Sequence, residues 1–123
     1  MNKLMIVDDS STMRKIIKRV LRQAEIEVDN ILEAGNGVEA LEQLLANPDI
    51  ALILSDVNMP EMNGIELVKK VREQKDSDAL PIIMVTTEGG DTMIASAMGN
   101  GANGYVTKPF TPDSIRAALA AFI

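Results

Sequence analysis

The sequence predicts one doubly wound α/β domain, in which helices cover both faces of a parallel β-sheet. Five short apolar segments alternate with five segments of helical periodicity, at about 20 to 25 residues per unit, which is typical of strands joined by right-handed crossovers. The apolar run that ends in Asp56 shows no alternation with polar residues, as expected of a strand covered on both faces. Because the 123 residues contain no linker-like stretch, residues 1–123 are expected to form a single domain.

The five strands are expected at short segments of mostly apolar residues. In chain order these segments are Lys3–Val7, Asp29–Ala34, Ala51–Asp56, Ile82–Val85 and Asn103–Thr107. The third ends abruptly in an acid, and Pro60 with Asn63-Gly64 beyond it directs the chain out of the sheet. Since parallel sheets hold ligands at the carboxyl ends of their strands, Asp56 is expected on the rim of a site.

The five helices are expected where apolar residues recur at steps of three and four. The first begins near Thr12 with Ser10 or Ser11 as its N-cap, and the last has Pro112 at its first helical position. Helix by helix, the residues expected to face the core are Met13, Ile16, Ile17, Val20, Leu21 and Ala24; Val38, Leu41, Leu44 and Leu45; Ile65, Leu67, Val68 and Val71; Met93, Ile94, Ala97 and Met98; and Ile115, Leu119 and Phe122.

Composition narrows the classes of function. Eighteen acidic and twelve basic residues give a net charge of −6, which argues against unaided binding to nucleic acid or an anionic membrane. The chain has no cysteine, and no apolar run approaches the roughly 18 to 20 residues of a membrane span. We expect a soluble, cytoplasmic protein that is a monomer.

Polar side chains follow four of the expected strands. Asp8 and Asp9 follow the first, Asp56 ends the third, and Thr86 and Lys108 follow the fourth and fifth. These strand ends meet at one edge of a parallel sheet, so the side chains are expected to converge. Two carboxylates about 4 Å apart repel by roughly 4 kcal/mol at an effective dielectric near 20, so three acids need cations among them. Lys108 offsets one charge, and an all-oxygen site suits Mg²⁺, with Mn²⁺ possible.

Four motifs of this chain occur together in a known family. They are Val7-Asp8-Asp9-Ser10, Asp56-Val-Asn-Met-Pro60 with Gly64, Val85-Thr86, and Tyr105-Val-Thr-Lys108-Pro109-Phe110. The chain resembles the receiver domain of two-component response regulators, most closely its single-domain chemotaxis members. The resemblance covers essentially the whole chain and implies a flavodoxin-like sheet with the strand order 2-1-3-4-5.

The resemblance also implies the roles of the acids. Asp56 would accept a phosphoryl group from the phosphohistidine of a histidine kinase in a Mg²⁺-dependent transfer. Asp9 and Asp56 would bind the metal together with the backbone carbonyl of Asn58, and Asp8 would act mainly through water. The protein would then be a signalling module and not an enzyme, its chemistry limited to gaining and losing its own phosphoryl group.

The same resemblance implies roles for further residues. Lys108 would pair with the phosphoryl group and Thr86 would hydrogen-bond it, while Tyr105 turns inward as a switch. An output partner such as the flagellar motor switch would bind the face formed by the fourth helix, fifth strand and fifth helix. Asn58 and Glu88 would tune the loss of phosphate, with a lifetime of seconds to minutes.

Simpler and competing interpretations remain open. Taken alone, Asp8-Asp9 is more often a solvated strand end than a metal site, and it is the convergence of motifs at four strand ends that favours the site. A phosphatase of the haloacid-dehalogenase type would be expected to carry an acid where this chain has Asn58. A flavodoxin-like cofactor binder is disfavoured because Asp8 and Asp9 would repel its phosphate. The chain could also be the receiver part of a longer, DNA-binding regulator.

Overall fold

The computed structural model describes residues 1–87 and 91–123, and within them the predicted architecture is confirmed. The sheet is parallel, with the order β2-β1-β3-β4-β5. Its strands are β1 (Lys3–Val7), β2 (Asn30–Ala34), β3 (Leu52–Asp56), β4 (Ile82–Thr87) and β5 (Gly104–Lys108). The helices are α1 (Ser11–Gln23), α2 (Gly37–Ala46), α3 (Gly64–Arg72), α4 (Asp91–Gly99) and α5 (Pro112–Leu119). No helix of the described ranges is long and apolar enough to span a membrane.

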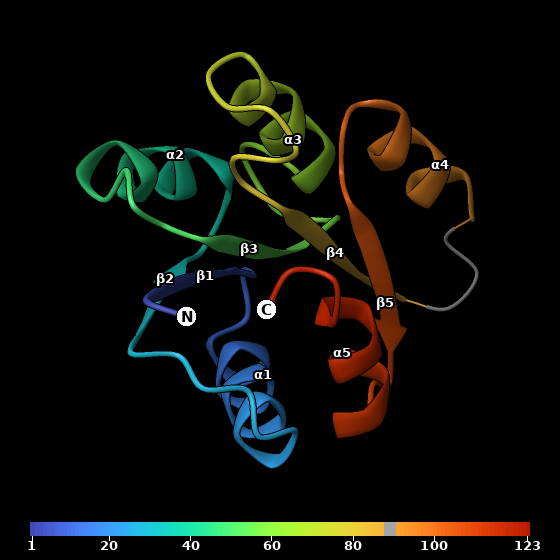
Figure 1. Ribbon diagram of the computed structural model, residues 1–123. Helices are drawn as coiled ribbons and strands as arrows, with labels where there is room; N and C mark the ends of the chain where they lie inside the picture. The colour runs from blue at the N-terminus through green and yellow to red at the C-terminus, as the bar shows by residue number, and fades with distance from the viewer. Residues whose placement is uncertain (88–90) are drawn as a thin grey trace.

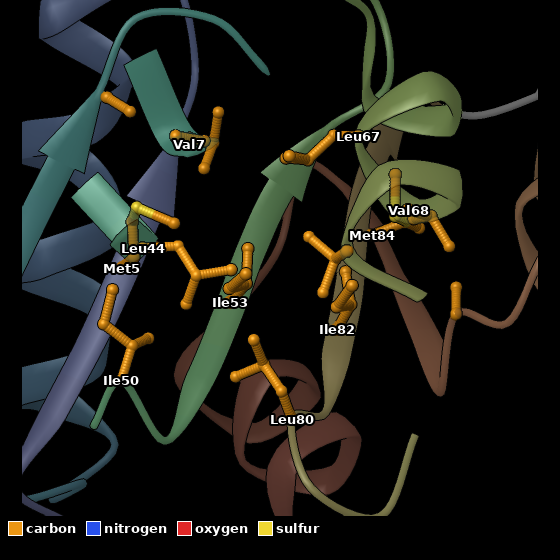
Figure 2. Close-up of a cluster of buried hydrophobic side chains, with 14 of the residues drawn as sticks. Met5, Val7, Leu44, Ile50, Ile53, Leu67, Val68, Leu80, Ile82 and Met84 are labelled. Atoms are coloured by element: carbon orange, nitrogen blue, oxygen red, sulfur yellow. The ribbon is translucent and has the colours of Figure 1, made fainter. Parts of the chain in front are cut away.

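Helices cover the sheet on both faces, with α1 and α5 on one side and α2, α3 and α4 on the other (Figure 1). Successive residues of a strand point to opposite faces, so a strand buried on both sides must be apolar throughout. In β1, Met5 and Val7 join the cluster under α2 and α3, which Figure 2 shows, while Leu4 and Ile6 join the cluster under α1 and α5. This double burial explains the unbroken apolar runs and fixes the strand ends rigidly.

Side-chain caps set where the helices begin after the strands. Ser10, Asn36 and Asn63 each accept a hydrogen bond from the backbone N–H three residues later, at 3.2, 2.9 and 2.9 Å. Thr111 forms a reciprocal capping box with Ser114 at the start of α5. All four caps stand in loops that leave the carboxyl edge of the sheet, so they restrain the backbone around the predicted site.

Four residues expected to face the core lie at the surface instead. Their exposed fractions are 37% for Ile16, 37% for Val38, 84% for Leu45 and 41% for Met98. In α2, Ala40 and Leu44 already fill the contact with the sheet, and each further residue turns the side chain by about 100°. Apolar periodicity thus overestimates the width of the buried stripe, because it cannot show how much of a helix its neighbours cover.

Arg72, the last residue of α3, ties two loops together at the amino edge of the sheet. Its guanidinium donates to the carbonyl oxygens of Gly101 and Leu80, at 2.9 and 2.8 Å, and to Oδ1 of Asn103 at 2.9 Å. The same Oδ1 accepts the N–H of Ile82 at 3.0 Å, at the start of β4. Partial burial lowers the pKa of Arg72 from its usual value. The strand start therefore depends on a cation that satisfies several backbone carbonyls.

We expect Arg72→Ala to lower the free energy of unfolding by about 2 kcal/mol, because it leaves buried carbonyl oxygens without donors. Urea denaturation measures the change. Lys69→Ala, an exposed change on the same helix, is the matched control and should stay within about 0.5 kcal/mol of the wild type. Equal stability of the two variants would contradict this role of Arg72.

Candidate metal and phosphoryl site

Three strand ends bring charged side chains together at the carboxyl edge of the sheet. Asp8 directly follows β1, Asp56 ends β3 and Lys108 ends β5. The Lys108 ammonium nitrogen lies 3.5 Å from Oδ2 of Asp8 and 3.7 Å from Oδ1 of Asp56. One carboxylate oxygen from each of Asp8, Asp9 and Asp56 lies within 4.8 Å of the others. The strand ends of the fold thus gather three acids around one ammonium group.

Burial strengthens the repulsion between Asp8 and Asp56, whereas Asp9 is exposed. The Asp8 side chain is only 2% exposed and that of Asp56 only 13%. Burial raises the pKa of Asp56 above its usual value; Lys108 opposes this shift, and the negative charge of Asp8 adds to it. The backbone N–H of Val57 donates to Oδ1 of Asp56 at 2.8 Å and favours the ionised form. An additional cation at this place would relieve the remaining negative charge.

The donor set of this cluster fits a hard divalent cation. Three carboxylates meet without a histidine or cysteine, and oxygen ligands are those that Mg²⁺ and Mn²⁺ prefer. Within residues 1–87 and 91–123, these acids are the only group of three such side chains close enough to share a metal ion. Asn58, whose backbone carbonyl is a predicted ligand, lies exposed in the loop after β3.

The loop after β3 folds back closely under Asp56. The N–H of Gly64 donates to the carbonyl of Val57 at 2.8 Å, and the N–H of Gly37 donates to the carbonyl of Met62 at 3.0 Å. A Cβ on Gly64 would lie 2.1 Å from the carbonyl oxygen of Asp56, which no side chain could tolerate. The sequence marked Gly64 as a turn residue, and the structure shows that its missing side chain also lets the loop pass against the carbonyl of Asp56.

The other predicted residues are placed at or near this edge. Thr86 lies in β4, one residue beyond the partner of Asp56 in the strand register, and is 4% exposed. Tyr105 in β5 is 49% exposed, so its ring points away from the core here. Glu88 lies outside the described residues. The structure thus brings together the acids and Lys108, and it leaves Tyr105 at the surface.

Residues 4–120 match the family described as the response regulator receiver domain. The chain belongs to this family. It is therefore a phosphorylation-activated signalling module of a two-component system. Receiver domains generally use Mg²⁺, which agrees with the donor set of the acid cluster.

Relatives of similar length support the assignment. The "Chemotaxis protein CheY homolog" of Campylobacter jejuni strain 81-176 is 52% identical over 117 residues, covering 95% of this chain and 88% of that protein. "Chemotaxis protein CheY1" of Helicobacter pylori strain 26695 is 50% identical, with 95% and 93% covered. Among solved structures, the chemotaxis protein CheY4 of Vibrio cholerae superposes with a TM-score of 0.83 at 36% identity, covering 100% of this receiver domain and 99% of that chain.

We expect Asp56→Asn to raise the free energy of unfolding at pH 7, without divalent metal, by on the order of 1 kcal/mol. The amide keeps the shape of the side chain but removes a buried charge that faces Asp8. Urea denaturation with a chelator present measures the difference. Glu42→Gln, an exposed neutralisation on α2, should change stability by less than about 0.5 kcal/mol.

The pH dependence of this difference has a defined sign. The pKa of Asp56 is higher in the folded than in the unfolded protein, so ionisation of this carboxyl destabilises the fold above the folded pKa. As pH falls through the folded pKa toward the unfolded one, the wild type regains stability and approaches Asp56→Asn. A difference that stays constant from pH 7 to acid, or an Asp56→Asn protein less stable than the wild type, would refute this account.

Proposed function

We propose that Asp56 of this receiver domain accepts a phosphoryl group from the phosphohistidine of a histidine kinase. The observation that carries the proposal is the convergence of Asp8, Asp9 and Asp56 within 4.8 Å, beside the Lys108 ammonium. In the transfer, an Asp56 carboxylate oxygen attacks phosphorus and the bond between phosphorus and the imidazole nitrogen breaks. The nitrogen keeps the electron pair, and a proton on the other ring nitrogen of the phosphohistidine lets the imidazole leave as a neutral group.

The chain's own residues would do three things for this reaction. The Val57 N–H, 2.8 Å from Oδ1, orients the Asp56 carboxylate, and Lys108 would donate from its ammonium group to the incoming phosphoryl oxygens. Asp9 and Asp56, with the backbone carbonyl of Asn58, would hold Mg²⁺, or Mn²⁺ in its place, and Asp8 would act through water. When bound, the metal neutralises charge on the carboxylates and the phosphoryl oxygens.

Phosphorylation would then change the output face through Thr86 and Tyr105. A phosphoryl group adds about −1.5 to −2 charges and three acceptor oxygens beside Lys108. Thr86, buried at the carboxyl edge, would follow these oxygens, and Tyr105, now 49% exposed, would turn inward. Both residues adjoin the face built from α4, β5 and α5, where an output partner would bind.

The pathway that fits best is chemotaxis. Relatives named as chemotaxis proteins match this chain over 88% and 93% of their own lengths, which favours this pathway over a DNA-binding regulator. The phosphodonor would then be a CheA-like histidine kinase, and the output partner a component of the flagellar motor switch. We propose that the protein acts as a monomer in the cytoplasm, without contacting nucleic acid or membrane.

Incubation with acetyl phosphate and Mg²⁺ should add one phosphoryl group to the wild type, because Asp56 and the metal-binding acids are already assembled. Intact mass spectrometry with and without a chelator measures the gain. Asp56→Asn should gain nothing, whereas Asp78→Asn, a change of an exposed acid elsewhere, should react like the wild type. Phosphorylation of Asp56→Asn at the wild-type rate would place the acceptor elsewhere.

The phosphorylated protein should lose its phosphate within seconds to minutes. Asn58, two residues beyond the acceptor, is exposed, and its resemblance to the residue at this place in chemotaxis regulators is the reason for this expectation. After the phosphodonor is removed, intact mass over time gives the lifetime, and adding a chelator should lengthen it. A lifetime of hours in the presence of Mg²⁺ would contradict this expectation.

A further inference from the structure

Arg14 differs from the other basic residues of α1. Lys15, Arg19 and Arg22 are exposed to solvent, whereas the Arg14 side chain is only 18% exposed and points toward the end of β1. One guanidinium nitrogen, Nη1, donates a hydrogen bond to the backbone carbonyl of Asp8. Arg14 thus reaches the acid cluster through the backbone carbonyl of Asp8 and not through a carboxylate.

A second strand holds Arg14 in this position. Its Nε donates to Oε1 of Glu33 in β2 at 2.9 Å, and the other oxygen of Glu33 lies 2.6 Å from the ammonium of Lys18. These two cations lower the pKa of Glu33, Lys18 more strongly, so the glutamate is ionised at neutral pH. The guanidinium is therefore fixed by one partner while it binds another, which a planar fork does better than a point charge.

The carbonyl that Arg14 binds belongs to the peptide joining Asp8 to Asp9. The other polar atoms of Asp8 also have partners. Its N–H donates to the carbonyl oxygen of Ala34 at 3.0 Å. One carboxylate oxygen accepts the Ser10 N–H at 2.9 Å, and the other lies 3.5 Å from the Lys108 ammonium. Asp9 is exposed, so the direction of its side chain depends on the backbone that carries it. The orientation of this peptide thus sets the backbone position from which the Asp9 carboxylate reaches the cluster.

We propose that Arg14 is a positioning residue for the acid cluster, fixing the Asp8–Asp9 peptide so that Asp9 can bind Mg²⁺ together with Asp56. This inference rests on the proposed function of the cluster as a metal site. Groups that orient metal ligands without touching the metal commonly change its affinity by about 10-fold to 100-fold when they are removed. Glu33 and Lys18 would support the same peptide indirectly by holding the guanidinium.

The sign of the effect separates positioning from simple electrostatics. A cation near three acids repels Mg²⁺, so removing it would by charge alone tighten metal binding. Loss of positioning would weaken metal binding despite this gain. If Arg14 only tied α1 to β2, its removal would lower the free energy of unfolding and leave the affinity of the folded protein for Mg²⁺ unchanged.

The test is direct binding of Mg²⁺ to the unphosphorylated protein, measured by titration calorimetry and by Mg²⁺ displacement of Mn²⁺ followed by electron paramagnetic resonance. Arg14→Met keeps the apolar stem of the side chain and removes the donors. We expect its Kd for Mg²⁺ to rise about tenfold. Arg19→Met removes the same charge from an exposed site on the same helix and should leave the Kd unchanged or slightly lower.

Two further variants keep the test decisive. Arg14→Lys retains the charge without the fork and should also bind Mg²⁺ more weakly than the wild type. Glu33→Gln leaves Arg14 intact but removes the charge that anchors it, and it should weaken binding in the same direction by a smaller factor. Circular dichroism confirms that each variant is folded, and Glu33→Gln decides the question if Arg14→Met does not fold.

The positioning role of Arg14 and the metal site itself can be disproved separately. Wild-type or tighter Mg²⁺ binding in folded Arg14→Met, or in Glu33→Gln if it alone folds, overturns the positioning role. Absence of Mg²⁺ binding in the wild type, or binding that survives in Asp9→Asn, overturns the metal site itself.

Discussion

Repulsion among three clustered carboxylates, one buried, one partly buried and one exposed, is the constraint on which the site depends. Asp8, Asp9 and Asp56 have oxygens within 4.8 Å of one another, while a single ammonium, that of Lys108, stands beside them. Left to itself, such a group would move apart or take up protons. The three acids stay together because they end or follow β1 and β3. Both faces of these strands are buried, so the strands cannot move apart without disturbing the packed core. A divalent cation would relieve this repulsion, and in the proposed function it does so before the phosphoryl group arrives.

The loops around the site are restrained as firmly as the strands. Ser10, Asn36 and Asn63 cap the helices that leave the carboxyl edge. Gly64 lets the loop after β3 pass against the carbonyl of Asp56, and the Val57 N–H fixes the carboxylate itself. Preorganisation of this kind lowers the entropy lost when ligands bind, because the acids need little rearrangement. The surface residue Tyr105, by contrast, lies where a change of position disturbs no packed core.

The local pattern of apolar and charged residues predicted the strands and the acid cluster, but it missed contacts between separate segments of the chain. Apolar runs gave the strands, and the acids at their ends predicted the cluster, because parallel topology forces strand ends together. The buried faces of the helices were overestimated at Leu45 and Met98, since periodicity does not show how far neighbouring helices extend. Arg14 and Arg72 received no role from the sequence, although each donates to a backbone carbonyl in another segment of the fold. Charge alone does not reveal such bonds, because they depend on where two loops meet in space.

A crystal structure of the protein grown with Mn²⁺, with anomalous diffraction measured, tests the central claim most directly. We expect one strong anomalous peak at the carboxyl edge of the sheet, in direct contact with carboxylate oxygens of Asp9 and Asp56. A crystal that shows no metal between the acids, or acids that point away from one another, would contradict it.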